Sequence, residues 1–447
     1  MGAPIGSEQF ESSFIKDKIE KIRTITTALP DLLQPHLEFV LLRSCLALPK
    51  ILYLLRTTDT SPFPHLLSEF DSITREALSR IAGGPISDQA WDQAKIPVSL
   101  GGLGLRAASD HALAAFATSL TSSQHLLHSL LHQDQEAAPF VLPPAVLNSL
   151  TEKLGEEDPV STEYFHNRTQ KMVSAKIDQV NQQRLSDRLK AEGCERDIAR
   201  FASVQLPNSH SGDWLSVSPS PGLNLLLRPP EFVAALRYRI GHPMFRADGP
   251  CPACNQPSDR FGDHAMNCAW QGERIARHNS LRDTLYNTAV SAALGPTREG
   301  QFLLPGEGGK PADVFIPNHT GGKDAALDVT VINPLQASLV ARAATEPGHA
   351  LNVAHKRKID KSWQPCHDQG IVFLPLAVES LGAWHKSAIA EVKKLGSSLA
   401  RHTGEEESVT INHLFQRLSI DLMRGNAALF NNRNPGDEGA GDEGLGW

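Results

Sequence analysis

The chain has 447 residues, of which 40% are hydrophobic and 21% charged, and its formal net charge is −7. The length allows two to four domains, and the composition is ordinary for a soluble globular protein. The acidic balance argues against a protein that coats nucleic acid non-specifically. The absence of any run of about eighteen apolar residues argues against a membrane-spanning helix.

The N-terminus lacks a basic start followed by an apolar run, so a secretory signal is not expected. Three of the six cysteines fall within eighteen positions, which indicates metal binding rather than disulfides and a nuclear or cytoplasmic location. Four acidic residues lie in the Gly-rich tail at 434–447, which we expect to be disordered. Nucleic-acid contact would therefore depend on local basic patches.

Residues 1–206 are expected to be mainly helical. The stretch HLEFVLLRSCLALPKILYLLR predicts a buried helix broken near Pro49, and Asp110–His132 has helical spacing. Ser161–Phe201 is polar and predicts either a solvent-bridging or a loosely packed helix. The glycines of IPVSLGGLGLRAA lack the Gly-Lys-Ser/Thr ending of a phosphate loop, so we expect a tight turn there. A Pro/Ser/Gly-rich connector at 207–230 is the expected main domain boundary.

The second half changes from helical to mixed periodicity. Short β-branched segments (TREGQFLLPG, KPADVFIPN, AALDVTVINP and IVFLPLAVES) predict four strands, the last three of them buried. Together with the helices they predict a small α/β or α+β domain over 271–405, after a cysteine-containing segment at 231–270. The helices are expected over Glu231–Ile240, Gln271–Leu294, Leu335–Trp363 with a break near Pro347, Ala383–Arg401 and, within a C-terminal element at 406–433, Thr410–Phe430.

Four potential metal ligands lie close together in CPACNQPSDRFGDHAMNC. Two residues separate Cys251 from Cys254, nine separate Cys254 from His264, and three separate His264 from Cys268. Three thiolates and an imidazole suit tetrahedral zinc, and four protein ligands leave no open position for water, so this zinc would be structural. The enclosed loop has too few apolar residues for a core, and zinc would supply its folding energy. The alternative is a chance cluster with a solvated histidine.

Downstream of the cysteines, Arg274, His278 and Arg282 recur every four residues on the expected helix over Gln271–Leu294. Residues at this spacing project from one face of a helix. Such a face could bind nucleic-acid phosphates. It could equally be an ordinary solvated charged face.

Two isolated carboxylates lie within apolar strand segments, Asp313 in KPADVFIP and Asp328 in ALDVTV. The strands are joined by the turn PNHTGGK, so the two side chains could lie side by side in a hairpin. Paired carboxylates provide the hard oxygen ligands of Mg²⁺, which could activate water and stabilise charge on a phosphodiester. Alternatively, each aspartate could cap a turn or pair with Lys310 or Lys323.

The order of a Cys-Cys-His-Cys knuckle, an Arg-His-x-x-x-Arg helix, Pro-Ala-Asp at 311–313, Asp-Val-Thr at 328–330 and a later lysine resembles the restriction-like endonuclease of non-LTR retrotransposons. That enzyme has the PD-(D/E)XK nuclease fold. Upstream, PVSLGGLGLR and its helical surroundings resemble the thumb and linker that follow the polymerase core in the same elements. The resemblance covers about Leu37–Phe430 and is most specific over Cys251–Gly382. It implies a mainly α N-terminal region, then a zinc knuckle and a small α/β PD-(D/E)XK-like nuclease domain.

Carried over by position, the resemblance makes Asp313 and Asp328 the Mg²⁺ ligands. The family's lysine often lies two places after the second acid, where this chain has Thr330. In the retrotransposon branch the following helix supplies it, which implies Lys358, with Lys361 one turn further on. This lysine would orient or help deprotonate the attacking water and neutralise phosphate charge.

Two features depart from the family pattern. Ala312 separates the proline from Asp313, which leaves the carboxylate itself unchanged, and a long gap separates Asp328 from Lys358. Two further carboxylates are possible accessory acids, or structural partners of arginines: Glu299 and Glu379.

The leading hypothesis is a Mg²⁺-dependent endonuclease that nicks DNA to a 3′-hydroxyl end, which in the family primes reverse transcription. No Asp-Asp pair exists in the sequence, so the Tyr-x-Asp-Asp turn of a reverse transcriptase is missing and no polymerase activity is expected. The chain would resemble the rear portion of a longer element, with element RNA and a reverse transcriptase in trans as partners. One alternative is a catalytically inactive zinc-knuckle protein that binds nucleic acid. Another is a scaffold whose long helices bind protein partners.

Overall fold

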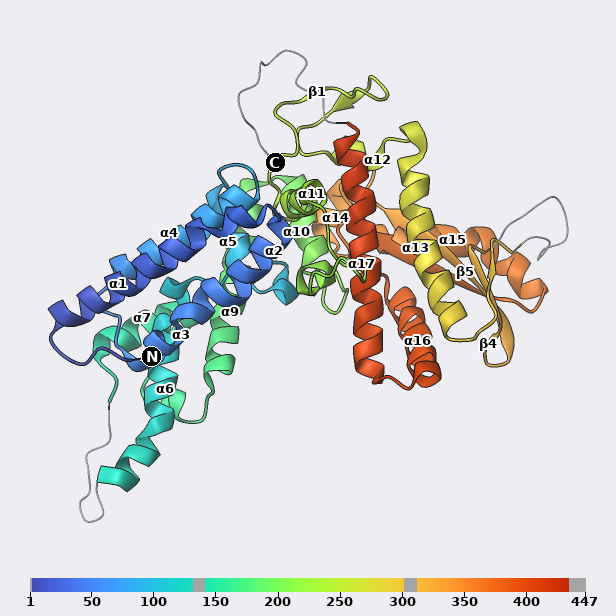
Figure 1. Cartoon of the computed structure of the whole chain (residues 1–447). Coiled ribbons are helices and arrows are strands. Elements are labelled where there is room, and N and C mark those ends of the chain that lie inside the picture. Colours follow the sequence, from blue (N-terminus) through green and yellow to red (C-terminus); the bar gives the residue numbers. More distant parts are fainter. Residues whose placement is uncertain (1, 132–140, 301–311, 434–447) are drawn as a thin grey trace. The chain divides into compact units, whose positions relative to one another are not determined.

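The computed structural model describes residues 2–131, 141–300 and 312–433 (Figure 1). Those residues are mainly helical, with two small sheets. The chain divides into two compact units, residues 1–188 and residues 189–447. No helix within the described ranges combines the length and the apolarity that crossing a bilayer would require.

The first unit is built from helices that pack around apolar clusters. In one core, the small residues Ala108, Ala112 and Ala115 of α6 pack among larger aliphatic and aromatic side chains such as Ile51 and Phe70. Alanine side chains allow helices to approach closely. The described elements are α1 (Glu8–Thr27), η1 (Leu29–Leu32), α2 (Pro35–Leu41), η2 (Leu42–Leu46), α3 (Leu48–Thr57), α4 (Pro64–Ile81), α5 (Asp88–Lys95), η3 (Val98–Leu100), α6 (Ala108–Leu131), α7 (Pro144–Leu154), α8 (Glu163–His166) and α9 (Gln170–Glu192), which runs past the end of this unit.

The long apolar helix expected to break near Pro49 is interrupted slightly earlier. A π-helical turn, η2, follows α2, and the chain leaves helical geometry at Ala47, whose ψ is −144°. Pro49 lies in the first turn of α3, where proline is tolerated because its missing N–H has no helical partner there. The glycine run forms a tight turn: Gly101 has φ 91°, and a Cβ on Gly102 would lie 1.8 Å from the Ile96 carbonyl oxygen.

The second unit begins with the end of α9. Its elements are α10 (Glu195–Val204), η4 (Asp213–Ser216), α11 (Pro229–Ile240), β1 (Gly249–Pro250), β2 (Pro257–Ser258), α12 (Asp263–Asn267), η5 (Trp270–Gly272), α13 (Glu273–Ser291), β3 (Thr297–Arg298), β4 (Val314–Thr320), β5 (Lys323–Ile332), α14 (Val340–Thr345), α15 (His349–Asp368), β6 (Val372–Glu379), α16 (Lys386–Thr403) and α17 (Glu407–Asn431).

The segment 207–230, expected to be an interdomain connector, packs within the second unit. The Trp214 side chain is buried, and its backbone N–H donates to the Ser419 hydroxyl of α17 at 3.1 Å. Arg417 of α17 donates to the Leu223 carbonyl at 3.3 Å. The structural division therefore differs from the expected boundary and falls within α9, after Arg188.

The larger sheet has the strand order β3-β4-β5-β6. The first three strands are antiparallel and β6 runs parallel to β5, so the chain must cross over between them, which it does through α14 and α15. Gly321 and Gly322, both with positive φ, form the β4–β5 turn. The expected first strand pairs only at Thr297–Arg298, and its continuation from residue 301 lies outside the described residues.

Candidate functional site

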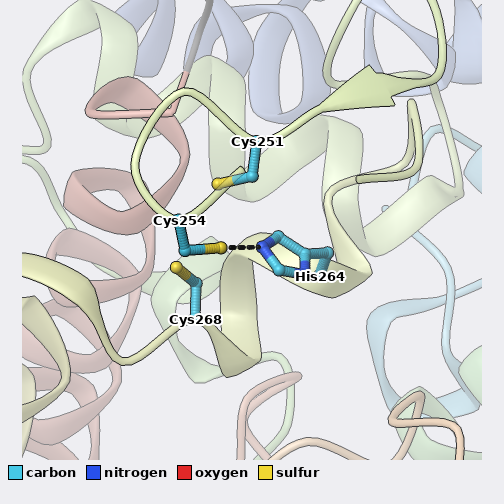
Figure 2. Close-up of side chains that lie close together, drawn as sticks. All are labelled: Cys251, Cys254, His264 and Cys268. Atoms are coloured by element: carbon cyan, nitrogen blue, oxygen red, sulfur yellow. Dashed lines mark hydrogen bonds between the residues drawn. The ribbon is translucent and has the colours of Figure 1, made fainter. Parts of the chain in front are cut away.

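The knuckle residues Cys251, Cys254, His264 and Cys268 form one cluster (Figure 2). Their ligand atoms all lie within 4.8 Å of one another, and Cys254 Sγ is 3.2 Å from His264 Nε2. In a tetrahedral zinc site with Zn–S bonds of about 2.3 Å, neighbouring sulfurs lie about 3.8 Å apart, so the cluster has the dimensions that zinc requires. All six cysteines of the chain are free thiols.

Backbone turns hold the knuckle ligands in place. The Asn255 N–H donates to the Cys251 carbonyl and the Cys251 N–H to the Gln256 carbonyl, each at 2.8 Å, which closes the turn carrying two thiols. The Asp259 carboxylate accepts from the backbone N–H of His264 at 2.8 Å at the start of α12. A short polar side chain in this position satisfies the free N–H groups of the first helical turn. The histidine is thus fixed independently of any metal.

Arg433, after α17, closes the knuckle from a distant part of the chain. Its guanidinium donates to the Trp270 carbonyl at 2.9 Å and to the Glu273 carboxylate at 3.1 Å. Burial opposes ionisation of the Cys268 thiol, but the hydrogen bond and charge of Arg433 outweigh it and lower the pKa of Cys268. A lowered thiol pKa favours the thiolate that binds metal.

The two strand aspartates belong to the same end of the β4–β5 pair. Val314, the residue after Asp313, pairs with Leu327, the residue before Asp328, so the two aspartates lie near each other at the end of the β4–β5 ladder. The Asp313 N–H donates to the Leu327 carbonyl at 2.9 Å, and the Asp313 carboxylate accepts from the Val329 N–H at 2.6 Å, which holds Asp313 alongside Asp328. Both side chains are largely shielded from solvent, with exposed fractions of 17% and 13%. The structure therefore brings together two carboxyl groups that the sequence separates by fifteen positions.

Each carboxylate is contacted by a cationic or polar side chain from a helix. Lys358 of α15 places its Nζ 2.7 Å from Asp328 Oδ2. His278 of α13 places its Nε2 3.0 Å from Asp313 Oδ2 and 3.1 Å from the Val329 carbonyl oxygen. An amine, an imidazole and two carboxyls thus meet at one edge of the second unit's core.

The environment moves the pKa values of the two carboxyls in opposite directions. Burial raises the pKa of Asp328 to about 6; the Asp313 charge reinforces this and Lys358 opposes it. Burial acts in the same way on Asp313, but the hydrogen bond and charge of His278 and the Val329 N–H outweigh it, so the pKa of Asp313 falls. The Asp313 hydrogen bond is also the main cause of the raised pKa of His278. Divergent pKa values in one pair are typical of functional acid pairs.

The helical face expected to bind phosphates is divided in the structure. Arg274 is exposed and donates to the Asn267 carbonyl at 3.1 Å, whereas His278 turns toward Asp313. Arg282 is only 8% exposed and donates to Glu299 at 2.5 Å. The four-residue spacing predicts which face of the helix a side chain lies on, but not which residues pack against that face. The different surroundings of these side chains were therefore not predicted.

The two accessory acids lie in different places. Glu299 directly follows β3, and its backbone N–H donates to the Asp313 carbonyl at 2.9 Å, so its backbone lies beside Asp313. The Glu299 carboxylate forms an ion pair with Arg282. Glu379 lies four residues beyond Pro375, the β6 partner of Asp328, and accepts a hydrogen bond from Ser203. The structure therefore does not bring Glu379 to the acid pair.

The expected second lysine also lies apart from the carboxylates. Lys361 is exposed on α15, and within the described ranges it forms no ion pair with either carboxylate. Only Lys358 of the two lysines contacts the acid pair. The contact of His278 with Asp313 was not predicted from the sequence. The sequence showed only that His278 lies one helical turn from both Arg274 and Arg282.

Comparison with known proteins adds one finding. A stretch of 60 residues is 38% identical to the retrotransposable element SLACS 132 kDa protein of Trypanosoma brucei gambiense. This similarity supports a retrotransposon origin. The matched stretch makes up 13% of this chain and 5% of the trypanosome protein. No protein-family model matches the chain.

Proposed function

We propose that the second unit is a Mg²⁺-dependent endonuclease with a PD-(D/E)XK-like core, of non-LTR retrotransposon type, which nicks DNA and leaves a 3′-hydroxyl end. The observation that carries the proposal is the pair of neighbouring carboxyl groups of Asp313 and Asp328, with the Lys358 amine 2.7 Å from Asp328. Two largely buried carboxylates repel each other unless a proton or a cation is shared between them. Hard oxygen ligands on adjacent strands suit Mg²⁺, which retains water molecules for chemistry.

Each residue has a distinct task in this proposal. Asp313 and Asp328 would hold Mg²⁺, which when bound polarises a phosphodiester and favours ionisation of water. Lys358, already paired with Asp328, would orient the attacking water and offset negative charge that develops on the phosphate. Arg274 and Lys361, both exposed, are available for contacts with DNA phosphates. The zinc of the knuckle would be structural, since all four ligands come from the protein.

The partners follow from the same proposal. DNA is the substrate, and the nucleus is where the enzyme would meet it. The 3′-hydroxyl end would serve as the primer for reverse transcription of element RNA.

A plasmid-nicking assay tests the activity. We expect the wild-type chain with Mg²⁺ to convert supercoiled plasmid to open circles whose ends a DNA polymerase can extend. Lys358→Met should reduce nicking about 100-fold, the lower range for losing one acid–base group, and Asp328→Asn, which removes a proposed Mg²⁺ ligand, should reduce it at least as much. Lys356→Met, an exposed lysine of the same helix, is the matched control and should nick normally. Equal nicking by wild type and Asp328→Asn would overturn the proposal.

A second candidate is a nucleic-acid-binding protein that no longer cuts. The complete cluster of Cys251, Cys254, His264 and Cys268 favours this candidate, because a structural zinc site can stabilise a nucleic-acid-binding fold in a protein that has no catalytic centre. DNA binding by the wild-type chain in a gel-shift assay at low salt, without nicking at any Mg²⁺ concentration, would favour this candidate over the enzyme.

A further inference from the structure

His278 and the backbone act together on one oxygen of Asp313. Asp313 Oδ2 accepts a hydrogen bond from the Val329 N–H at 2.6 Å and lies 3.0 Å from His278 Nε2. The same nitrogen is 3.1 Å from the Val329 carbonyl oxygen. Because a carbonyl oxygen can only accept, His278 Nε2 carries the hydrogen and donates. One carboxylate oxygen is therefore held by two donors from two different elements, β5 and α13.

We propose that His278 is a positioning residue that holds Asp313 so that its Oδ1 is presented to the catalytic cation. The inference rests on the proposed Mg²⁺ site. A carboxylate with one oxygen held by two donors has lost its freedom to rotate about its terminal bond, and its second oxygen points in a fixed direction. Partners that orient a metal ligand in this way contribute about 10-fold to 100-fold to metal affinity.

The position of His278 on α13 supports a dedicated role. Its side chain is 29% exposed and reaches from the helix to the β4–β5 edge. One turn away on either side, Arg274 contacts the knuckle segment and Arg282 binds Glu299, so neither supplies a donor to Asp313.

Two substitutions separate positioning from packing. His278→Leu removes the donor and keeps similar volume, whereas His278→Gln places an amide N–H at about the reach of the imidazole Nε2. We expect calorimetric titration with Mg²⁺, without DNA, to give a dissociation constant about 10-fold to 100-fold weaker for His278→Leu. His278→Gln should stay within about 3-fold of wild type, below the 10-fold loss expected for a missing partner. Asn287→Ala, which changes an exposed polar residue further along α13, is the matched control.

Nicking gives the second readout. His278→Leu should require a correspondingly higher Mg²⁺ concentration for half-maximal nicking, with nearly normal rates at saturation. Equal zinc content and equal melting temperature without Mg²⁺ would show that all the variants fold. If wild type and His278→Leu bind Mg²⁺ equally, the positioning role is overturned while the nuclease stands. If the wild-type chain binds no Mg²⁺ and does not nick, the nuclease proposal falls and takes this inference with it.

Discussion

Glu379 provides a test of whether a buried acid is structural or catalytic. Its side chain is 1% exposed and accepts a hydrogen bond from Ser203. Burial raises the pKa of Glu379 from 4.5 to about 7, with the Ser203 hydrogen bond opposing. Between these two pH values the folded chain retains a proton that the unfolded chain has lost, so stability falls as pH rises through the window. At about 1.36 kcal/mol per pH unit, the total cost above pH 7 is about 3 kcal/mol.

Glu379→Gln removes this titration and keeps an oxygen for Ser203. We expect the variant to match wild type near pH 4.5 and to be more stable by about 3 kcal/mol at pH 8, in urea denaturation at several pH values. Glu192→Gln changes an exposed glutamate in the same unit and serves as control. A stability difference that does not grow between pH 5 and pH 8 would refute the reasoning. Normal nicking by Glu379→Gln would further separate this acid from the catalytic pair.

Three further predictions concern the knuckle. Cys254→Ser should remove zinc from the purified chain, as measured by atomic absorption, and make residues 249–268 sensitive to limited proteolysis; retained zinc would contradict a structural site. Gly262→Ala should destabilise the chain by about 1–3 kcal/mol in urea, because φ is 84° and a Cβ would lie 2.5 Å from the Phe430 ring. An unchanged midpoint would show that the ring moves freely. Arg433→Met should cost about 3 kcal/mol by leaving Glu273 without its cation, and a loss below about 1 kcal/mol would mean that this pair contributes little.

Local sequence patterns predicted much of the second unit. The β-branched segments around Asp313 and Asp328 correspond to β4 and β5, and the short glycine turn joins them as an antiparallel pair whose far end carries the two acids. Cys-x-x-Cys followed by a histidine and a cysteine predicted a cluster whose ligand atoms do lie close together. In both cases the partners are near in sequence, so short-range geometry determines their contact.

Features that depend on distant packing were not predicted. The Trp214 segment has the composition of a linker, but α17, about two hundred residues later, covers it. Glu379 has the strand context of an accessory acid, yet its position along β6 places it beside Ser203. The direction of His278 depends on which strand edge lies opposite α13. No periodicity in one segment can specify these contacts, because each requires the arrangement of a second segment.

The contact between Arg433 and the knuckle has a consequence for biosynthesis. During translation at about 5–20 residues per second, Cys268 would be made about 8–33 s before Arg433. Throughout that interval Cys268 lacks its guanidinium neighbour and Glu273 its counter-charge. In nascent chains the knuckle would therefore lack its contacts with Arg433. A chain ended by a premature stop codon before α17 would never form these contacts.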